Sequence, residues 1–372
     1  MRIGLYYGMD LGTGSSGEQM YAEIADQVKH ADRDGIDTVW IAETHFAEGS
    51  CPSPQILIPA LGSMTTSIRI GPLKILSLDH QPVRIAEDFA QIDIELNGRL
   101  NFGVWEGNDA EAFRAHNQNM DDRWDRFREE LDFIQVAWSN DSFAYQGEYV
   151  TFPGNAGLLA QGTKRKWERA PFNPPYKPQW EWGDWVPPYL AVTPKPVQTP
   201  HPPVYVYGWR DQSIDFAAAH GNSMIFSHLE SLPRIREKVA RYTNALEAAG
   251  RASSEVDVAL VRDIWVHEDA DVARTQAKPV LEAAYQQANK DGSLAEAEGR
   301  DFYSDELSYE KLATDRFLIG EPKVVVDQIK MLQAETGINH LICRIPFPGV
   351  THTQVNEFID CFERYVHPML MV

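Results

Sequence analysis

Short strand-like runs alternate with helix-like segments along most of the 372-residue chain, and this alternation restricts the fold more than any other feature. Eight runs are rich in β-branched and aromatic residues, which is typical of buried strands. The predicted strands are residues 2–7, 38–41, 68–76, 100–104, 204–207, 224–226, 256–266 and 340–344. Strand–helix units in series favour a parallel sheet covered by helices. The sequence therefore predicts one α/β domain over residues 1–372, a (β/α)8 TIM barrel.

Glycine and proline residues set the limits of the predicted helices. The helix predicted at residues 18–34 stops at Gly35, and the one at 321–335 stops at Gly337. A strongly amphipathic helix over 82–96 has Pro82 in its first turn. The other predicted helices are residues 54–64, 124–138, 212–220, 232–249, 270–289 and 353–365, and a hairpin is predicted at 143–152.

Two stretches interrupt the alternation and are predicted to be insertion loops. Residues 153–203, just before the fifth strand, are rich in proline and tryptophan, whereas residues 291–315 are polar and irregular. Long segments without regular elements are often lids or binding loops. We expect the first insertion to enclose the substrate, because its end leads to the fifth strand and the loop after it. A linker between domains and an arm at a dimer interface are the alternatives.

Composition excludes several classes of protein. The formal net charge of −20 argues against binding to nucleic acid or to an anionic membrane surface. No apolar run is long enough for a membrane helix, and the first residues read as a strand rather than a signal peptide. The three cysteines are too few for a disulfide framework, so we expect a cytoplasmic protein. The histidines are scattered, so no metal site is expected.

The segment after the second strand contains the first candidate catalytic residues. Glu43, Thr44 and His45 follow the run Thr-Val-Trp-Ile at residues 38–41. In a parallel barrel the carboxyl ends of the strands carry the chemistry. His45 is the best candidate for proton transfer, because the unperturbed imidazole pKa of about 6.5 suits acid–base work. The alternative is structural, with Glu43 capping a helix and His45 bonded to a loop.

The segment after the fifth strand predicts an anion site. Residues 208–213 lead into a helix and include Trp209, Arg210 and Ser213. Free amides at a helix N-terminus, a guanidinium and a hydroxyl together suit a phosphate, although an ordinary helix cap with a surface arginine is equally compatible. The chain has no dinucleotide-binding glycine motif, P-loop or serine elbow. A glycosidase that uses Glu43 and Glu106 as paired carboxylates stays open as a minor alternative.

Five motifs in order along the chain resemble the bacterial luciferase-like flavin monooxygenases, and the similarity spans nearly the whole length outside the two insertions. The motifs are Trp-Ile-Ala-Glu-Thr-His-Phe at 40–46, Gln-Pro-Val-Arg-Ile-Ala-Glu-Asp at 81–88, Asn-Gly-Arg-Leu-Asn-Phe-Gly-Val at 97–104, Ile-Asp-Phe-Ala-Ala-Ala-His-Gly at 214–221, and Gly-Glu-Pro at 320–322 with Thr-Gly-Ile at 336–338.

The resemblance implies an enzyme and a cofactor. It implies a homodimeric, FMNH2-dependent two-component monooxygenase, with a separate flavin reductase that supplies reduced FMN. O2 would form a flavin 4a-hydroperoxide that oxidises a small to medium hydrophobic organic substrate. It also implies that Glu43, Thr44 and His45 are catalytic. Thr44 would hydrogen-bond to the peroxide or the flavin, and Glu43 would orient His45 and Thr44.

The resemblance further indicates which residues contact the flavin. It implies a cis peptide bond between Leu73 and Lys74 beside the flavin ring. Luciferases commonly have a cysteine where this chain has Trp105 and an arginine near the phosphate where it has Glu106. They also have a histidine in place of Thr44, so light emission and the aldehyde chemistry are not implied. We expect Arg210 to replace the missing arginine, with Trp209 and Ser213 beside it.

Two rival functions follow from the same resemblance. One is a deazaflavin-dependent oxidoreductase of the same superfamily, which would transfer hydride without oxygen. The other is a non-catalytic relative that binds and stores a flavin.

Overall fold

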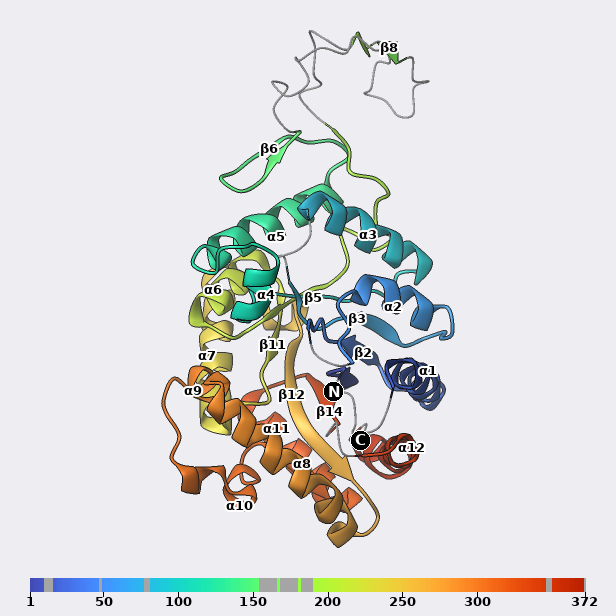
Figure 1. Ribbon diagram of the computed structural model, residues 1–372, viewed down its shortest axis with the longest axis vertical. Helices are drawn as coiled ribbons and strands as arrows, with labels where there is room; N and C mark the ends of the chain where they lie inside the picture. The colour runs from blue at the N-terminus through green and yellow to red at the C-terminus, as the bar shows by residue number, and fades with distance from the viewer. Residues whose placement is uncertain are drawn as a thin grey trace.

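The computed structural model describes residues 1–9, 16–46, 49–76, 81–153, 190–345 and 350–370, together with the backbone of residues 166–167 and 180–181. Parallel strands form the centre of the molecule and helices surround them (Figure 1). The barrel strands are β1 (Arg2–Tyr7), β2 (Thr38–Ile41), β3 (Arg69–Pro72), β4 (Ile75–Leu76), β5 (Phe102–Trp105), β10 (Val204–Tyr207), β11 (Ser223–Phe226), β12 (Val258–Val266) and β14 (His340–Arg344).

The sheet closes on itself as a barrel. Its order is β3-β2-β1-β14-β12-β11-β10-β5-β4, and every pairing along it is parallel. A bridge between Ile70 and Leu100 brings β3 to the start of β5 and joins the two ends. The predicted third strand is divided into β3 and β4 after its Gly-Pro pair, and the two pieces continue one barrel position. The predicted α/β TIM barrel is confirmed.

Helices cover the outside of the barrel. They are α1 (Gly17–Asp34), α2 (Pro54–Gly62), α3 (Pro82–Glu95), α4 (Ala110–Ala115), α5 (Arg123–Ser139), α6 (Asp211–His220), α7 (Leu232–Ala248), α8 (Ala270–Lys290), α9 (Ser293–Glu298), α10 (Tyr309–Leu312), α11 (Pro322–Thr336), α12 (His352–Cys361) and α13 (His367–Leu370). Short turns of helix occupy Ser253–Glu255 and Ser304–Leu307, and a π-helical turn, Phe362–Val366, joins α12 to α13. No helix in these described ranges combines the length and the apolar character needed to cross a membrane.

The predicted helix stops follow from local chemistry. Gly35 and Gly337 have φ values of 91° and 75°, the left-handed conformation that ends a helix and that glycine adopts without steric cost. At the other end of α1, the Ser16 side chain accepts a hydrogen bond from the Gln19 amide at 3.2 Å.

The amino-terminal half of the barrel interior is filled by aromatic rings and a hydrogen-bonded polar cluster. The Trp40 ring packs edge-on against Tyr205 at 4.8 Å, and its indole N–H donates to Thr38 Oγ1 at 2.9 Å. His340 Nε2 lies 2.9 Å from the same hydroxyl. A Cβ on Gly4 would lie 2.2 Å from Thr38 Oγ1, so only glycine fits on β1 at this level. This packed layer supports the carboxyl-terminal rim above it.

The structure corrects the sequence interpretation at three elements. Residues 291–315 are not an irregular loop, because they form α9, the turn at Ser304–Leu307 and α10. An unpredicted strand, β13 (Phe317–Gly320), pairs in parallel with the carboxyl-terminal part of β12. The short helix α4 was also not predicted.

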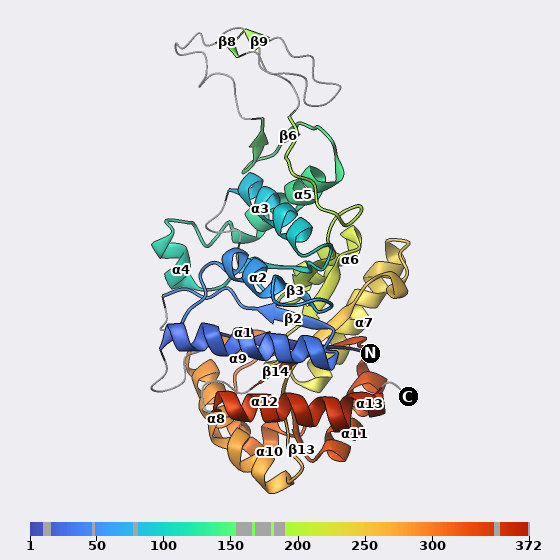
Figure 2. The same cartoon turned by 90° about the vertical axis from the view of Figure 1, so that its right-hand side faces the viewer.

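The described flanks of the first insertion lie on the outer side of α5. The hairpin of β6 (Tyr145–Gln146) and β7 (Thr151–Phe152) is held there by Glu129, whose carboxylate accepts bonds from the amides of Tyr149 and Val150 at 2.8 and 2.7 Å. Figure 2 shows this hairpin beyond α3 and α5. Strands β8 (Lys166–Trp167) and β9 (Trp180–Glu181) pair with each other, and otherwise residues 154–189 lie outside the described residues.

The predicted enclosure of the substrate by residues 153–203 stays a prediction, because most of these residues lie outside the described ranges. The position expected for the end of this segment, near the flavin, is wrong. A segment that precedes a strand enters at the strand's amino end, whereas the catalytic rim is at the carboxyl end. The described part of the insertion follows this rule, because Gln198 contacts Asp93 near the end of α3 and the Leu100 carbonyl just before β5. In Figure 2 the N-terminus, which begins β1, and α4, which follows β5, lie on opposite sides of the barrel.

The predicted cis peptide bond between Leu73 and Lys74 is also wrong. The cis bonds within the described ranges all precede proline, at Pro153, Pro194 and Pro200.

Candidate active site

Glu43 and His45 form a buried pair at the carboxyl end of β2. His45 Nε2 lies 2.9 Å from Glu43 Oε1, and the two side chains are 7% and 0% exposed. Both residues follow the strand by only a few positions, so the barrel wall fixes their backbone. A carboxylate that accepts from one imidazole nitrogen orients the ring and stabilises its protonated form. The structure brings Glu43 and His45 together, and the catalytic roles expected of them stay predictions.

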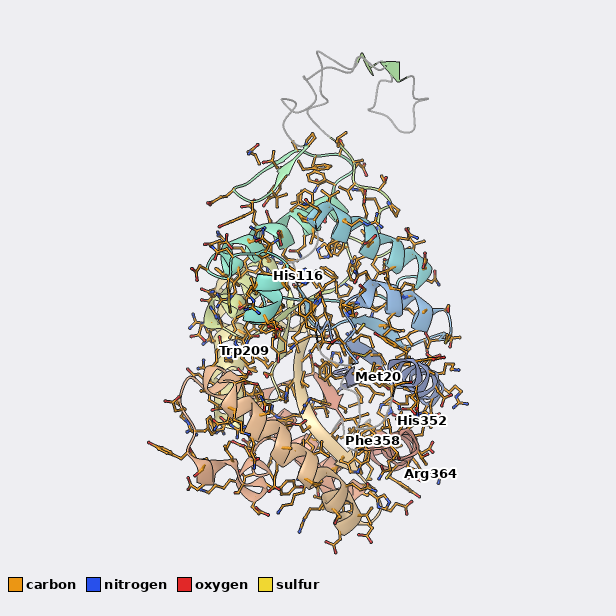
Figure 3. The ribbon with its side chains drawn as sticks, viewed as in Figure 1. Met20, His116, Trp209, His352, Phe358 and Arg364 are labelled. Atoms are coloured by element: carbon orange, nitrogen blue, oxygen red, sulfur yellow. The ribbon has the colours of Figure 1, made fainter. Side chains whose placement is uncertain are left out.

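Two further aromatic rings surround this pair. His116, the residue that ends α4, meets the His45 ring edge-on at 5.2 Å, and the Phe46 ring lies 5.7 Å from each of the two histidines. Figure 3 labels His116, which lies on the side of the barrel that faces the viewer. The sequence interpretation missed His116 because it missed α4. The signal was present: Asp109 caps this helix by accepting from the amides of Glu111 and Ala112.

Thr44 shapes the loop after β2. Its Oγ1 accepts from the Cys51 amide at 2.9 Å, and its own amide donates to the Cys51 carbonyl at 3.1 Å. These two bonds fix the ends of the loop that carries His45. The predicted bond from Thr44 to a flavin or a peroxide is untested and stays a prediction.

Aromatic side chains from the carboxyl ends of β5 and β10 gather around Lys74, which lies between β3 and β4. The Trp105 ring lies 5.6 Å from Tyr207 and 5.9 Å from Trp209, and Tyr207 and Trp209 stack at 6.1 Å. The Lys74 ammonium stands 4.7 Å from the Trp105 ring centre and 5.3 Å from that of Tyr207. Figure 3 labels Trp209 in this region. Among the predicted flavin contacts, the structure thus brings Lys74, Trp105 and Trp209 together, and Leu73 is buried beside them.

The N-terminus of α6 has the features of the predicted anion site. Arg210 is the residue that precedes the helix, and Ser213 in its first turn is fully buried. The amides of Asp211 and Gln212 have no hydrogen-bond partner within the ranges that the structure describes. Such free amides, together with the helix dipole, favour an anion.

Two carboxylates and a second arginine share this site. Arg210 lies 3.1 Å from Glu296 Oε1 through Nη2 and 3.9 Å from Glu106 Oε1 through Nε. Glu106 is 1% exposed, and its Oε1 also lies 3.4 Å from Ser213 Oγ. Burial lowers the pKa of the Arg123 guanidinium, and the nearby Arg210 charge lowers it further. Arg123, at the start of α5, and Glu296, on α9, were not predicted from the sequence.

A buried ion pair supports the loop between β10 and α6. Lys238 of α7 donates to the carbonyls of Gly208 and Trp209 at 2.9 and 3.0 Å and to the Glu230 carboxylate. Both charged side chains are 1% exposed or less. A Cβ on Gly208 would lie 2.5 Å from the Met224 side chain, so the close approach of this loop to β11 favours glycine. The position of Trp209 and Arg210 thus depends on a distant helix, which no local sequence pattern indicates.

A second set of buried charges closes the rim at β12 and β14. Arg344 pairs with Asp263, which also accepts from the Tyr285 hydroxyl at 3.0 Å. Burial lowers the pKa of His228 well below its ordinary value, and the charges of Arg344 and Lys74 act in the same direction. His228 is therefore neutral at pH 7. The adjacent charges Arg262-Asp263 inside an otherwise apolar strand were a signal that the sequence interpretation left unused.

One potential metal-ligand group lies away from the rim, in the helical layer. His30 Nε2 is 3.1 Å from Asp34 on α1 and 2.9 Å from Asp360 on α12. One of these contacts lies within α1, and the other joins α1 to α12.

Comparison with known proteins now identifies the class. A family-level sequence profile described as luciferase-like monooxygenase matches residues 1–176 and 177–340. The chain therefore belongs to the luciferase-like monooxygenase family. Its relatives include both monooxygenases and F420-dependent oxidoreductases.

Relatives of both kinds are equally similar in sequence. The chain is 24% identical to the oxygenase component of a flavin-dependent trigonelline monooxygenase from Acinetobacter baylyi, over 74% of this chain and 69% of that protein. It is also 24% identical to an F420-dependent glucose-6-phosphate dehydrogenase from Amycolatopsis mediterranei, over 97% and 98%.

A solved structure shares the fold. The oxygenating constituent of 3,6-diketocamphane monooxygenase from Pseudomonas putida, a type II Baeyer–Villiger monooxygenase in complex with FMN, superimposes with a TM-score of 0.76. It is 19% identical, and the match covers 99% of this chain and 98% of that one. The family and the fold together make this chain an oxidoreductase of the luciferase-like class.

Proposed function

We propose that this protein is an FMNH2-dependent two-component monooxygenase that oxidises a small to medium hydrophobic organic molecule with O2. A separate flavin reductase would supply the reduced FMN, as the name of the trigonelline relative, an oxygenase component, suggests. One observation carries the proposal: the His45–Glu43 pair after β2 and the candidate anion site at Arg210 and Ser213 after β10 lie on the same rim of the barrel.

The residues of this chain fit a phosphorylated flavin. Trp105 Nε1 and Glu106 Oε2 are buried polar atoms with no hydrogen-bond partner within the described ranges. Buried polar atoms in native proteins are normally satisfied, so orphaned ones at a rim indicate a missing ligand. Arg210, Ser213 and the free amides of α6 would hold the phosphate, and the rings around Trp105 would provide apolar surface for the flavin ring.

FMN, when reduced and bound, supplies the chemistry that activates O2; the protein supplies position, dryness and a proton. His45, oriented by the Glu43 carboxylate, would exchange a proton with the reacting groups. The packed rings of Trp105 and Tyr207 exclude water from the floor of the site. The neutral His228 imidazole can accept or donate a hydrogen bond without adding charge.

Reduced F420 is the cofactor of the main alternative. The buried Glu106 favours it in one respect, because a phosphodiester carries a single charge and is repelled less by a carboxylate than a phosphate dianion. The acidic surroundings oppose it, because F420 continues into an oligoglutamate tail. Glu296 lies directly beside Arg210, and the chain as a whole carries a formal charge of −20. We therefore place FMN first.

A competition titration tests the choice of cofactor. Trp105 and Trp209 lie in the proposed flavin site, so a bound flavin should quench tryptophan fluorescence. Under anaerobic conditions, the titration should show that reduced FMN binds at least about ten times more tightly than reduced F420. Tighter binding of reduced F420 would favour the hydride-transferring alternative instead.

Oxygen consumption separates an enzyme from a flavin store. With substrate, the protein should consume O2 with reduced FMN and release little hydrogen peroxide, whereas a non-catalytic flavin binder would leave peroxide as the only product. The expected homodimer and the expected cytoplasmic location both stay predictions.

A further inference from the structure

Glu106 has an orphaned oxygen in a place where a carboxylate is difficult to explain. It directly follows β5, is 1% exposed, and has one oxygen 3.4 Å from Ser213 Oγ. Its other oxygen, Oε2, has no hydrogen-bond partner within the described ranges. Leaving a buried polar atom unpaired is destabilising, and more so if the group is charged. A ligand, a proton or both must satisfy this carboxyl group.

The charges that face Glu106 cancel when it is ionised. Arg210 reaches it from the start of α6, at 3.9 Å, and Arg123 acts on it from the start of α5. Glu296 on α9 also pairs with Arg210, at 3.1 Å. Two cations thus balance two carboxylates, and the cluster has no net positive charge to attract a phosphate dianion. If Glu106 is protonated, the cluster has one net positive charge.

A proton is available near neutral pH. Burial raises the pKa of Glu106 to about 7, and its own backbone amide, Arg210, Ser213 and Arg123 only partly oppose this effect. A phosphate dianion placed beside the carboxyl group would raise its pKa further, because like charges favour the neutral form.

We propose that Glu106 is a specificity residue that binds the FMN phosphate as a neutral carboxylic acid, with its O–H donating to a phosphate oxygen, so that binding of reduced FMN takes up a proton from solution. The inference rests on the proposed function, because it needs FMN as the ligand. No bond other than the O–H bond of this one proton is formed. It also explains how a glutamate can replace the arginine expected at this position.

The proton uptake can be calculated from the two groups. A phosphate monoester has a second pKa of about 6, and in the complex the phosphate and Glu106 share one proton. Free enzyme and free FMN together hold about one proton at pH 6.5 but only about 0.1 at pH 8, with the carboxyl pKa at about 7. Binding should therefore take up almost no proton at pH 6.5 and about 0.9 proton at pH 8. Affinity should fall roughly tenfold per pH unit above pH 8.

Calorimetry measures this uptake without catalysis. Reduced FMN is titrated anaerobically into the full-length protein at pH 8 in three buffers of different ionisation enthalpy, and the slope gives the number of protons bound. Reduced riboflavin carries the same ring without the phosphate, so its slope is subtracted. We expect a difference of about 0.9 proton for the wild type and about zero for Glu106→Gln, whose amide donates at every pH.

The control variant is Asp215→Asn, which removes a carboxylate on the outer side of the same helix, where it pairs with Arg241, and should retain an uptake of about 0.9 proton. A wild-type difference near zero at pH 8, with FMN bound, would overturn the inference and leave the proposed function intact. If reduced FMN does not bind the wild type, the proposed function fails as well. If Glu106→Gln does not fold, as judged by loss of riboflavin binding, the wild-type difference between pH 6.5 and pH 8 decides.

Discussion

Replacing Arg210 with alanine should weaken binding of reduced FMN far more than binding of reduced riboflavin. Arg210 stands at the N-terminus of α6, where only the phosphate of FMN would reach it. Charge-assisted hydrogen bonds contribute about 1.5–3 kcal/mol, which corresponds to roughly 10- to 150-fold in affinity. The loss should lie in the upper part of this range, because the substitution also leaves Glu106 and Glu296 without their shared cation.

The assay is anaerobic quenching of tryptophan fluorescence by the two reduced flavins. The matched control is Arg241→Ala, which removes an arginine that contacts the same helix from its outer side through Asp215 at 2.6 Å. The control should change the affinity for FMN by less than about fivefold, because exposed ion pairs contribute about 1 kcal/mol or less. Equal losses for FMN and riboflavin in Arg210→Ala would refute the assignment of the phosphate to α6.

Three further substitutions test other parts of the site. His45→Ala should reduce substrate oxygenation by roughly 100- to 10,000-fold and leave flavin affinity within about threefold. Turnover of this variant at the wild-type rate would mean that another group transfers the proton. Glu106→Gln should remove a pH dependence of stability. Because the folded pKa of about 7 exceeds the ordinary 4.5, the stability from this group is complete below pH 4.5 and is lost as the pH rises through 7. In urea unfolding the wild type should lose up to about 3 kcal/mol between pH 4.5 and pH 8.5 relative to the variant, and parallel curves would contradict the burial argument. Lys238→Met should destabilise the protein by about 3–5 kcal/mol, since it strands the buried Glu230, and Lys238→Met with Glu230→Gln should recover most of this loss in the same assay.

The sequence predicts the parts of this protein that depend on local patterns. The eight barrel strands follow from runs such as residues 204–207, and the helix ends follow from glycines such as Gly35. The His45–Glu43 pair could be found because its members are two positions apart on one strand end. Arg210 and Ser213 could be found because both belong to one helix start.

The errors come from contacts between distant segments and from one wrong direction. Lys238 and Glu296 reach the rim from α7 and α9, and no local pattern connects them with Trp209 or Arg210. Strand β13 was missed because it is only four residues long and follows a polar segment. These residues form a strand by pairing with β12. The end of the first insertion was expected near the rim because it precedes a strand in sequence, although the chain enters a strand at the opposite end, as Gln198 shows.

Isotope incorporation tests the central claim most directly. The protein is incubated with a flavin reductase, NADH, FMN and a mixture of small hydrophobic organic molecules under oxygen-18 gas, and the products are compared by mass spectrometry with a parallel sample under ordinary oxygen. The account predicts a product that gains a single labelled oxygen atom, depends on reduced FMN, and is lost in His45→Ala. The absence of any labelled product with reduced FMN, together with oxidation of a substrate by F420 without oxygen, would contradict it.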